Sequence, residues 1–190
     1  HAALRLELVD AANARNAAMA FNRLVDRDID ASNPRTAMRD IPAGRISPAA
    51  ATVFVVANCV AFVGLAWLLN PLCLALSPVA LLLVLGYSLT KRFTSLCHVW
   101  LGLAIGISPL AASIAASGRF STVPVVLGLV LWTWMTGFDI VYATQDASHD
   151  KRLGLHSIPA ALGRDGALRV SAAMHFATLG LVVLTGRLAG

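Results

Sequence analysis

The chain has 190 residues, of which 57% are hydrophobic and 13% are charged, against about 25% charged residues in an ordinary soluble domain. This composition excludes an ordinary soluble globular protein. The 15 Lys and Arg and the 10 Asp and Glu give a net charge of +5, and they cluster so as to leave uncharged runs at residues 46–90, 93–118, 120–138 and 170–186. Because a helix needs roughly 20 apolar residues to cross the hydrocarbon core, the sequence predicts an all-α, polytopic transmembrane helical bundle.

Proline and glycine divide the uncharged runs into separate helices. Asn70-Pro71 splits the longest run into two spans joined by a tight turn, because proline lacks an N–H donor and restricts the residue before it. Six helices are predicted, at about residues 1–31, 48–69, 72–89, 97–117, 122–148 and 165–187. The first is the weakest candidate span, since it carries Arg5, Glu7, Asp10 and Arg15.

The connections between these helices differ in positive charge. Segments 23–47, 91–97 and 151–169 together hold eleven Lys and Arg, whereas the turns at 70 and 119 and the C-terminal end hold two. Positive residues favour the cytoplasmic side of a membrane, so we expect these three segments to face the cytoplasm. Seven aspartates lie on the same side, and this end of the bundle is therefore where we expect a functional site.

The first predicted helix ends in polar side chains that recur at every fourth residue. Asn22, Asp26 and Asp30 fall on one helix face within about 80°, because four residues advance a helix by about 40° beyond a full turn. Asp28 points nearly the opposite way. The sequence thus predicts one oxygen-rich face at this helix end.

A second oxygen-rich face is predicted at the end of helix 122–148. Asp139, Tyr142, Asp146 and Asp150 fall within about 80° of one another on a continuous helix. Asp139 lies about two turns deeper than Asp146 and borders the apolar run directly. A carboxylate at that depth needs a partner or a function.

Oxygen donors in this spacing suit a hard divalent cation. Mg2+ favours one or two carboxylates together with phosphate oxygens and water, so a diphosphate is the natural third ligand. Arg15 lies about two turns before Asn22, and Lys91-Arg92 follows Tyr87. These cations are suited to phosphate oxygens.

Other polar residues have simpler interpretations. Charges at membrane helix ends are often solvated at the interface, and we assign that role to Asp28, Asp40, Arg164, Asp165 and Arg169. Tyr87 and Tyr142 suit the aromatic belt of a membrane protein equally well by position alone. No chemistry is assigned to the scattered cysteines or histidines, namely Cys59, Cys73, Cys97, His98, His149, His156 and His175.

From Ala14 to about Gly186 the sequence resembles the UbiA superfamily of intramembrane aromatic prenyltransferases. NxxxDxxxD at 22–30 with NPRTxxRxxPAG at 33–44 resembles the family's first motif and loop, and YxxxKRFT at 87–94 its middle signature. DxxYAxxDxxxDxxxGxxSIP at 139–159 resembles its second motif. The likeness is greatest to 4-hydroxybenzoate polyprenyltransferase-like members of the menaquinone branch, judging from residues 17–23 and the loop that follows.

The resemblance implies a bundle of nine membrane helices, of which this chain would hold about six. On this interpretation residues 1–190 are a single transmembrane prenyltransferase domain and a fragment lacking the first and last helices, set in a bacterial plasma membrane with its active-site cap on the cytoplasmic side. Gly102 and Gly106 would leave room for an isoprenoid or serve as close helix contacts.

The implied reaction is Mg2+-dependent transfer of a polyprenyl group from its diphosphate to a ring carbon of a hydroxylated aromatic acid in quinone biosynthesis. The partners are these two substrates and the lipid bilayer, with no nucleic acid and no obligatory protein partner. The resemblance implies metal ligands at Asn22, Asp26, Asp30, Asp146 and Asp150. It implies catalytic residues at Arg15, Tyr87, Lys91 and Asp139, and substrate-binding residues at Arg15, Lys91, Arg92, Tyr142 and Lys151.

Two other classes of function remain open from the sequence. A transporter or cation-binding protein would also carry intramembrane carboxylates, but it needs charge at the bilayer centre or on both sides, and the opposite side here has almost none. A catalytically inactive membrane partner is the other alternative, which the intact spacing of both acidic motifs disfavours.

Overall fold

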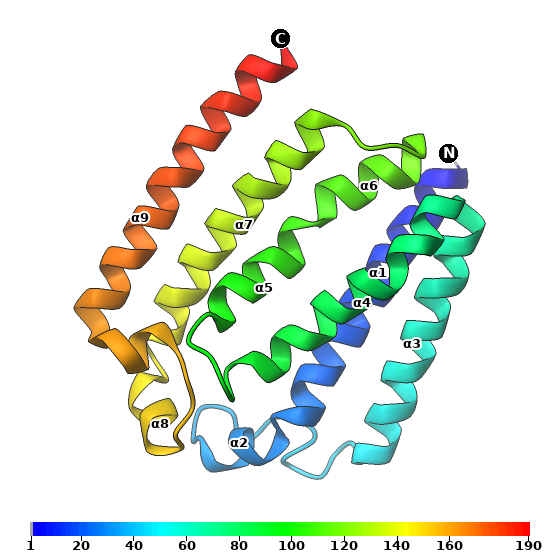
Figure 1. The fold of residues 1–190 in the computed structure, drawn as a ribbon. Coiled ribbons are helices and arrows are strands. Elements are labelled where there is room, and N and C mark those ends of the chain that lie inside the picture. The colour runs from blue at the N-terminus through cyan, green and yellow to red at the C-terminus, as the bar shows by residue number, and fades with distance from the viewer. Residues whose placement is uncertain (1) are drawn as a thin grey trace. The chain divides into compact units, whose positions relative to one another are not determined.

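The computed structural model describes residues 2–190, and within them every regular element is a helix. The chain divides into two compact units whose boundary lies near the end of α4 (Pro71–Thr90), one up to Ser88 and the other from Leu89 onward. The first predicted motif lies in the first unit, and the second motif lies in the second (Figure 1).

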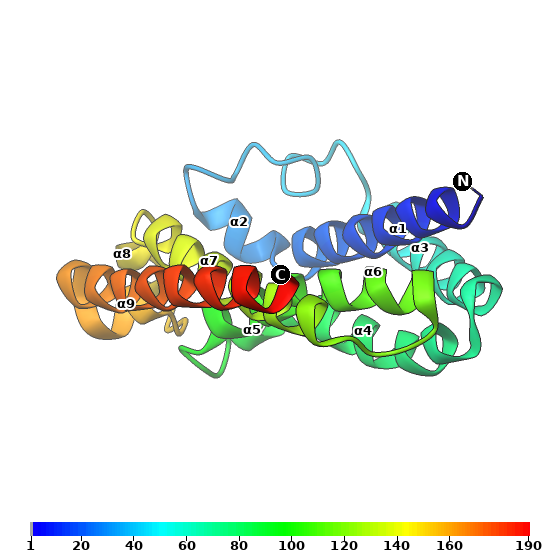
Figure 2. The ribbon, with the colours of Figure 1, turned by 90° about the horizontal axis from the view of Figure 1, so that it is seen from above.

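The first unit contains α1 (Ala2–Val25), α2 (Arg27–Ser32), α3 (Pro48–Leu69) and α4 (Pro71–Thr90), and α1 packs along α3. The predicted turn at Asn70-Pro71 is confirmed, and the Asn70 side chain accepts a hydrogen bond from the Cys73 N–H. Ser47 caps the start of α3 by accepting from the Ala50 N–H. Figure 2 shows the chain between α2 and α3 as a wide arc.

The second unit contains α5 (Cys97–Gly106), α6 (Ser108–Ser117), α7 (Thr122–Ala143), α8 (Ala147–Arg152) and α9 (Ile158–Ala189). Long helix α7 packs between α5 on one side and α9 on the other (Figure 1). The buried cluster Ile140, Ile158 and Ala167 joins α7 to the start of α9. The second motif therefore begins on the central helix of this unit.

Glycines bring α5 and α7 into close contact. A Cβ atom added to Gly106 would lie 2.8 Å from the Gly128 carbonyl oxygen, and one added to Gly128 would lie 2.6 Å from the Gly106 carbonyl oxygen. A Cβ atom added to Gly102 would likewise collide with the Thr136 side chain and the Trp132 carbonyl oxygen. The two open interpretations of Gly102 and Gly106 are thus decided within this unit in favour of close helix contacts.

Among the described residues, five helical segments are long and apolar enough to cross a membrane: Pro48–Leu69, Pro71–Thr90, Cys97–Ser117, Thr122–Ala143 and Ile158–Ala189. Helix α1 is not among them, in keeping with the charges that made it the weakest predicted span. Large apolar side chains such as Trp67 and Phe176 remain exposed on these segments, as expected of surfaces that contact lipid rather than water. The prediction of a polytopic helical bundle is confirmed.

Several predicted helix boundaries are wrong, and each error has a local cause. The helix predicted at 1–31 breaks at Asp26, and the one at 97–117 breaks before Pro109, which cannot donate a backbone hydrogen bond. The helix predicted at 122–148 ends at Ala143. In the last helix Gly163, with a φ of 70° that glycine tolerates best, separates a short segment that begins at Ile158 from the long helix that follows, so the predicted start at 165 is confirmed to within a residue or two.

Candidate functional site

The first acidic motif lies across the break between α1 and α2. The Asp26 N–H donates to the Asn22 carbonyl at 3.0 Å, and the Asp30 N–H donates to the Asp26 carbonyl at 2.7 Å. These four-residue hydrogen bonds end α1 and begin α2 at Asp26, whose ψ of 6° breaks the helix. The Asn22 side-chain amide also donates to Asp26 Oδ2 at 3.2 Å. Asn22 and Asp26 are thus neighbouring oxygen donors, and the Asp26 residue is buried.

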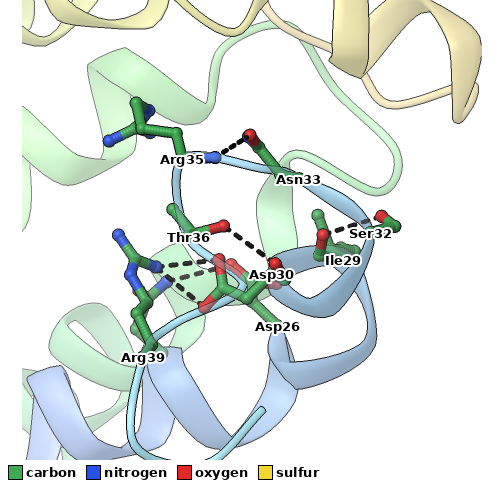
Figure 3. Close-up of polar contacts among 9 residues, drawn as sticks. Asp26, Ile29, Asp30, Ser32, Asn33, Arg35, Thr36 and Arg39 are labelled. Carbon is green, nitrogen blue, oxygen red and sulfur yellow. Dashed lines mark hydrogen bonds and ion pairs between the residues drawn. The ribbon is translucent and has the colours of Figure 1, made fainter. Parts of the chain in front are cut away.

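The Asp30 carboxylate is held by an arginine from the following loop. Arg39 Nη1 lies 2.8 Å from each carboxylate oxygen, and the Thr36 hydroxyl donates to the Asp30 carbonyl at 3.0 Å. In Figure 3 the side chains of Asp26, Asp30 and Arg39 point toward one another. Asp30 therefore anchors the loop to α2, whereas its predicted role as a metal ligand stays a prediction.

The loop that follows α2 is ordered by its own polar side chains. The Arg35 N–H donates to Asn33 Oδ1 at 3.0 Å, which forms an Asx turn at the start of the loop (Figure 3). Farther along, Arg45 Nε donates to Asp40 Oδ1 at 2.8 Å in an exposed ion pair. The basic loop thus has a fixed shape beside the Asn22 and Asp26 oxygens.

Two further predicted residues lie in the first unit. Arg15 is exposed on α1, and Tyr87 is half-buried near the end of α4. The seven residues between Arg15 and Asn22 correspond to about two helical turns of α1. Their proposed contacts with substrate stay predictions.

The second acidic motif is divided between two helices. Asp139 and Tyr142 lie on α7, Asp146 precedes α8, and Asp150 lies within α8. Between them the N–H groups of residues 144–146 donate to carbonyls three residues earlier instead of four. The predicted continuous helix face is therefore wrong. Short polar side chains compete with the helix backbone for hydrogen bonds, and Thr144 does so by donating to the Val141 carbonyl at 2.7 Å.

The structure supplies a partner for Asp139 that the sequence analysis missed. His98, on α5, is buried, and its Nδ1 lies 2.6 Å from Asp139 Oδ2. Its other ring nitrogen, Nε2, accepts a hydrogen bond from the Ile158 N–H at 3.3 Å. The depth of Asp139 indicated that a partner was needed, but nothing in the local pattern distinguished His98 from the other histidines.

The middle signature is fastened to the loop of the second motif. The His156 N–H donates to the Lys91 carbonyl at 2.7 Å, and Cys97 Sγ donates to the His156 carbonyl at 3.5 Å. Together with the His98 to Ile158 hydrogen bond, these contacts tie residues 91–98 to residues 156–158. The side chains of Arg92, Tyr142 and Lys151 belong to exposed residues of this unit, and Lys91 is half-buried.

Within residues 2–190 no group of three or more His, Cys, Asp or Glu side chains is placed to hold a metal ion. The Asn22 and Asp26 pair nevertheless consists of oxygen donors only, one amide and one carboxylate. Such a set fits a hard cation that completes its shell with water and substrate phosphate oxygens, as Mg2+ does, rather than one held in a cage of protein ligands.

The family model described as UbiA prenyltransferase family matches residues 8–190. A 4-hydroxybenzoate octaprenyltransferase from Alkalilimnicola ehrlichii is 38% identical over 151 residues, which cover 79% of this chain and 51% of that protein. The chain thus spans about half the length of this curated relative.

Solved structures show the same fold. The apo structure of a UbiA homologue from Aeropyrum pernix K1 has a TM-score of 0.91 and 36% identity, covering 97% of this chain and 72% of that one. A UbiA homologue from Archaeoglobus fulgidus bound to DMAPP and Mg2+ has a TM-score of 0.78 and 20% identity, covering 99% of this chain and 67% of that one. By the family match over nearly its whole length, the chain belongs to the UbiA prenyltransferase family.

Proposed function

We propose that the full-length protein transfers a polyprenyl group from polyprenyl diphosphate to a ring carbon of a 4-hydroxybenzoate-like aromatic acid. The observation that carries the proposal is the pair of oxygen donors Asn22 and Asp26, held in register by backbone hydrogen bonds beside a basic loop. The Alkalilimnicola ehrlichii relative, a 4-hydroxybenzoate octaprenyltransferase, supports the choice of substrates. We place the reaction in quinone biosynthesis, in its menaquinone branch, on the cytoplasmic side of a bacterial plasma membrane.

The two acidic motifs are proposed to act on the diphosphate. Asn22, Asp26, Asp146 and Asp150 are the proposed Mg2+ ligands, with Asp30 as support. When bound, Mg2+ would supply positive charge to the diphosphate as it leaves. The solved Archaeoglobus fulgidus homologue with DMAPP and Mg2+ supports this choice of metal. The proposed cationic contacts to the diphosphate are Arg15, Lys91, Arg92 and Lys151.

The remaining chemistry is assigned to the chain's apolar helices and to two polar residues. When the allylic C–O bond breaks, its electron pair leaves with the diphosphate, and the resulting allylic cation must meet the aromatic ring before it meets water. The apolar helices exclude water from that encounter. Asp139 and Tyr87 are proposed to lie beside the acceptor, with Asp139 accepting a hydrogen bond from its hydroxyl group. The ring carbon then forms the new C–C bond, and its proton passes to the released diphosphate.

The test uses the full-length protein in membranes with a polyprenyl diphosphate and 4-hydroxybenzoate. Asp26→Ala and Asp146→Ala are each expected to lower product formation by at least about 100-fold, the scale of losing one group that stabilises a leaving charge. Asp28→Ala and Asp165→Ala are the control variants, because both residues are exposed carboxylates, Asp28 on α2 beside Asp26 and Asp165 on α9. These controls are expected to retain activity.

Removal of divalent cations with a chelator is expected to abolish the reaction, and added Mg2+ should restore it. The proposal fails if folded wild-type protein makes no prenylated product from a series of isoprenoid chain lengths and hydroxylated aromatic acids. If Asp26→Ala is as active as Asp28→Ala, the first acidic motif takes no part in the reaction.

A further inference from the structure

We propose that His98 is a positioning residue, which orients the Asp139 carboxylate toward the aromatic acceptor. This inference rests on the proposed function, in which Asp139 contacts that acceptor. It begins from a contact between two helices, because His98 lies near the start of α5 and Asp139 lies on α7. Their Nδ1 to Oδ2 distance of 2.6 Å is shorter than the usual N–H···O range of about 2.7–3.2 Å.

The hydrogen bonds on the two sides of the imidazole define its proton arrangement. The Ile158 N–H donates to Nε2, so Nε2 is the acceptor nitrogen of a neutral ring. The ring proton then lies on Nδ1, where it is donated to Asp139 Oδ2. This arrangement makes Asp139 the acceptor and gives the ring one orientation, because turning it over would lose both hydrogen bonds.

The Ile158 N–H that donates to His98 belongs to a helix start that is itself held by hydrogen bonds. Ile158 is the first residue of α9, and its N–H is one of the helix-start donors that have no partner within the helix. Ser157 caps the same helix start by accepting from the Ala160 N–H. His98 therefore joins the start of α9 to Asp139 on α7.

The His98 side chain is more deeply buried than the Asp139 side chain, as expected if His98 orients Asp139. The side chain of His98 is 4% exposed, whereas that of Asp139 is 26% exposed. Within the described residues Asp139 Oδ2 is engaged by His98, and Oδ1 makes no hydrogen bond that the structure shows. One carboxylate oxygen is thus fixed by the protein, and the other is left for a ligand. Moving a group that contacts the substrate by about 1 Å lowers the rate on the order of 100-fold.

The test compares two substitutions at position 98 in the full-length enzyme. His98→Leu removes both hydrogen bonds at a similar size, whereas His98→Asn keeps an amide donor near the position of Nδ1. His98→Leu is expected to lower kcat/KM for the aromatic acid by about 10- to 100-fold, with KM for the polyprenyl diphosphate unchanged. His98→Asn is expected to recover most of that loss. Ser171→Ala is the matched control, because it removes a buried hydrogen bond from α9 to the Gly137 carbonyl of α7 without touching Asp139.

A double-mutant cycle separates positioning from a general structural role. If His98 acts through Asp139, His98→Leu combined with Asp139→Asn will be no less active than Asp139→Asn alone. Independent, multiplying losses would overturn the inference. So would an equal effect of His98→Leu on both substrates, no recovery by His98→Asn, or an Asp139→Asn variant with wild-type activity.

A measurement without activity distinguishes failure of this inference from failure of the proposed function. Nitrogen NMR of histidine-labelled protein is expected to show His98 as the neutral tautomer with its proton on Nδ1, and Asp139→Ala should change that signal. A proton on Nε2 would overturn the inference even in an active enzyme. An inactive wild-type protein that shows the expected tautomer would instead refute the proposed function and leave the His98 to Asp139 contact established.

Discussion

Replacing Arg39 with methionine should destabilise the first unit far more than the same replacement at Arg45. Arg39 and Arg45 both lie in the loop after α2, and each forms an ion pair with an aspartate at 2.8 Å. The two ion pairs differ in their exposure to solvent. The Asp30 side chain is 7% exposed, whereas that of Asp40 is 56% exposed. Arg39→Met leaves a buried carboxylate without its counter-charge, which costs about 3–5 kcal/mol in comparable buried pairs.

The matched substitution Arg45→Met removes an exposed ion pair, which is worth about 0.2–1 kcal/mol, together with a donor to the Met38 carbonyl. Thermal unfolding in detergent and hydrogen exchange of residues 33–46 report the two losses. Combining Asp30→Asn with Arg39→Met removes the stranded charge, so the double variant should recover part of the stability. Equal stability of Arg39→Met and Arg45→Met would refute the assignment of Asp30 as the buried anchor of the loop.

Two further predictions concern the close helix contacts of the second unit. Gly106→Ala and Gly128→Ala should each lower the stability by about 1–3 kcal/mol, because the added Cβ meets a backbone carbonyl. Gly64→Ala is the control, since the space around Gly64 is open, and it should gain up to about 1 kcal/mol from the better helix propensity of alanine. Unchanged melting of both Gly106→Ala and Gly128→Ala would contradict the close contact. Gly137→Ala should displace the His175 ring, which a Cβ atom would meet at 2.7 Å. That ring also packs edge-on against Trp134, so Gly137→Ala should change the Trp fluorescence. The change should be absent when Trp134 is replaced by Phe. An unchanged spectrum of Gly137→Ala would count against the displacement of the ring.

The apolar spans were predictable because length and charge alone decide them. The uncharged run 46–90 with Asn70-Pro71 at its centre predicted α3 and α4 to within a residue or two, since proline acts on the backbone of its immediate neighbours. The contact between His98 and Asp139 was not predictable in that way. The two residues are 41 positions apart, and helical periodicity relates residues within one helix but not across two.

The helix breaks inside both acidic motifs were missed for a different reason. Asp26 and Asp146 each stand where a predicted continuous helix divides in two. Aspartate and the nearby serine and threonine residues are poor helix formers, because their short side chains compete for backbone hydrogen bonds. A preference of this size is easily outweighed by context, so periodicity alone extended both helices too far.

The two motifs differ in how the chain passes through its break. At Asp26 two four-residue hydrogen bonds flank the break, and the Asn22 amide contacts the Asp26 carboxylate, so these two residues remain neighbours as predicted. Before Asp146 three successive N–H groups donate to carbonyls three residues earlier, which tightens the turn and rotates the following residues relative to α7. Asp139 thus lies on α7, apart from Asp146 and Asp150, and it has its own partner in His98. This division of the motif between two helices supports the proposal that Asp146 and Asp150 contact the diphosphate and Asp139 contacts the aromatic acceptor.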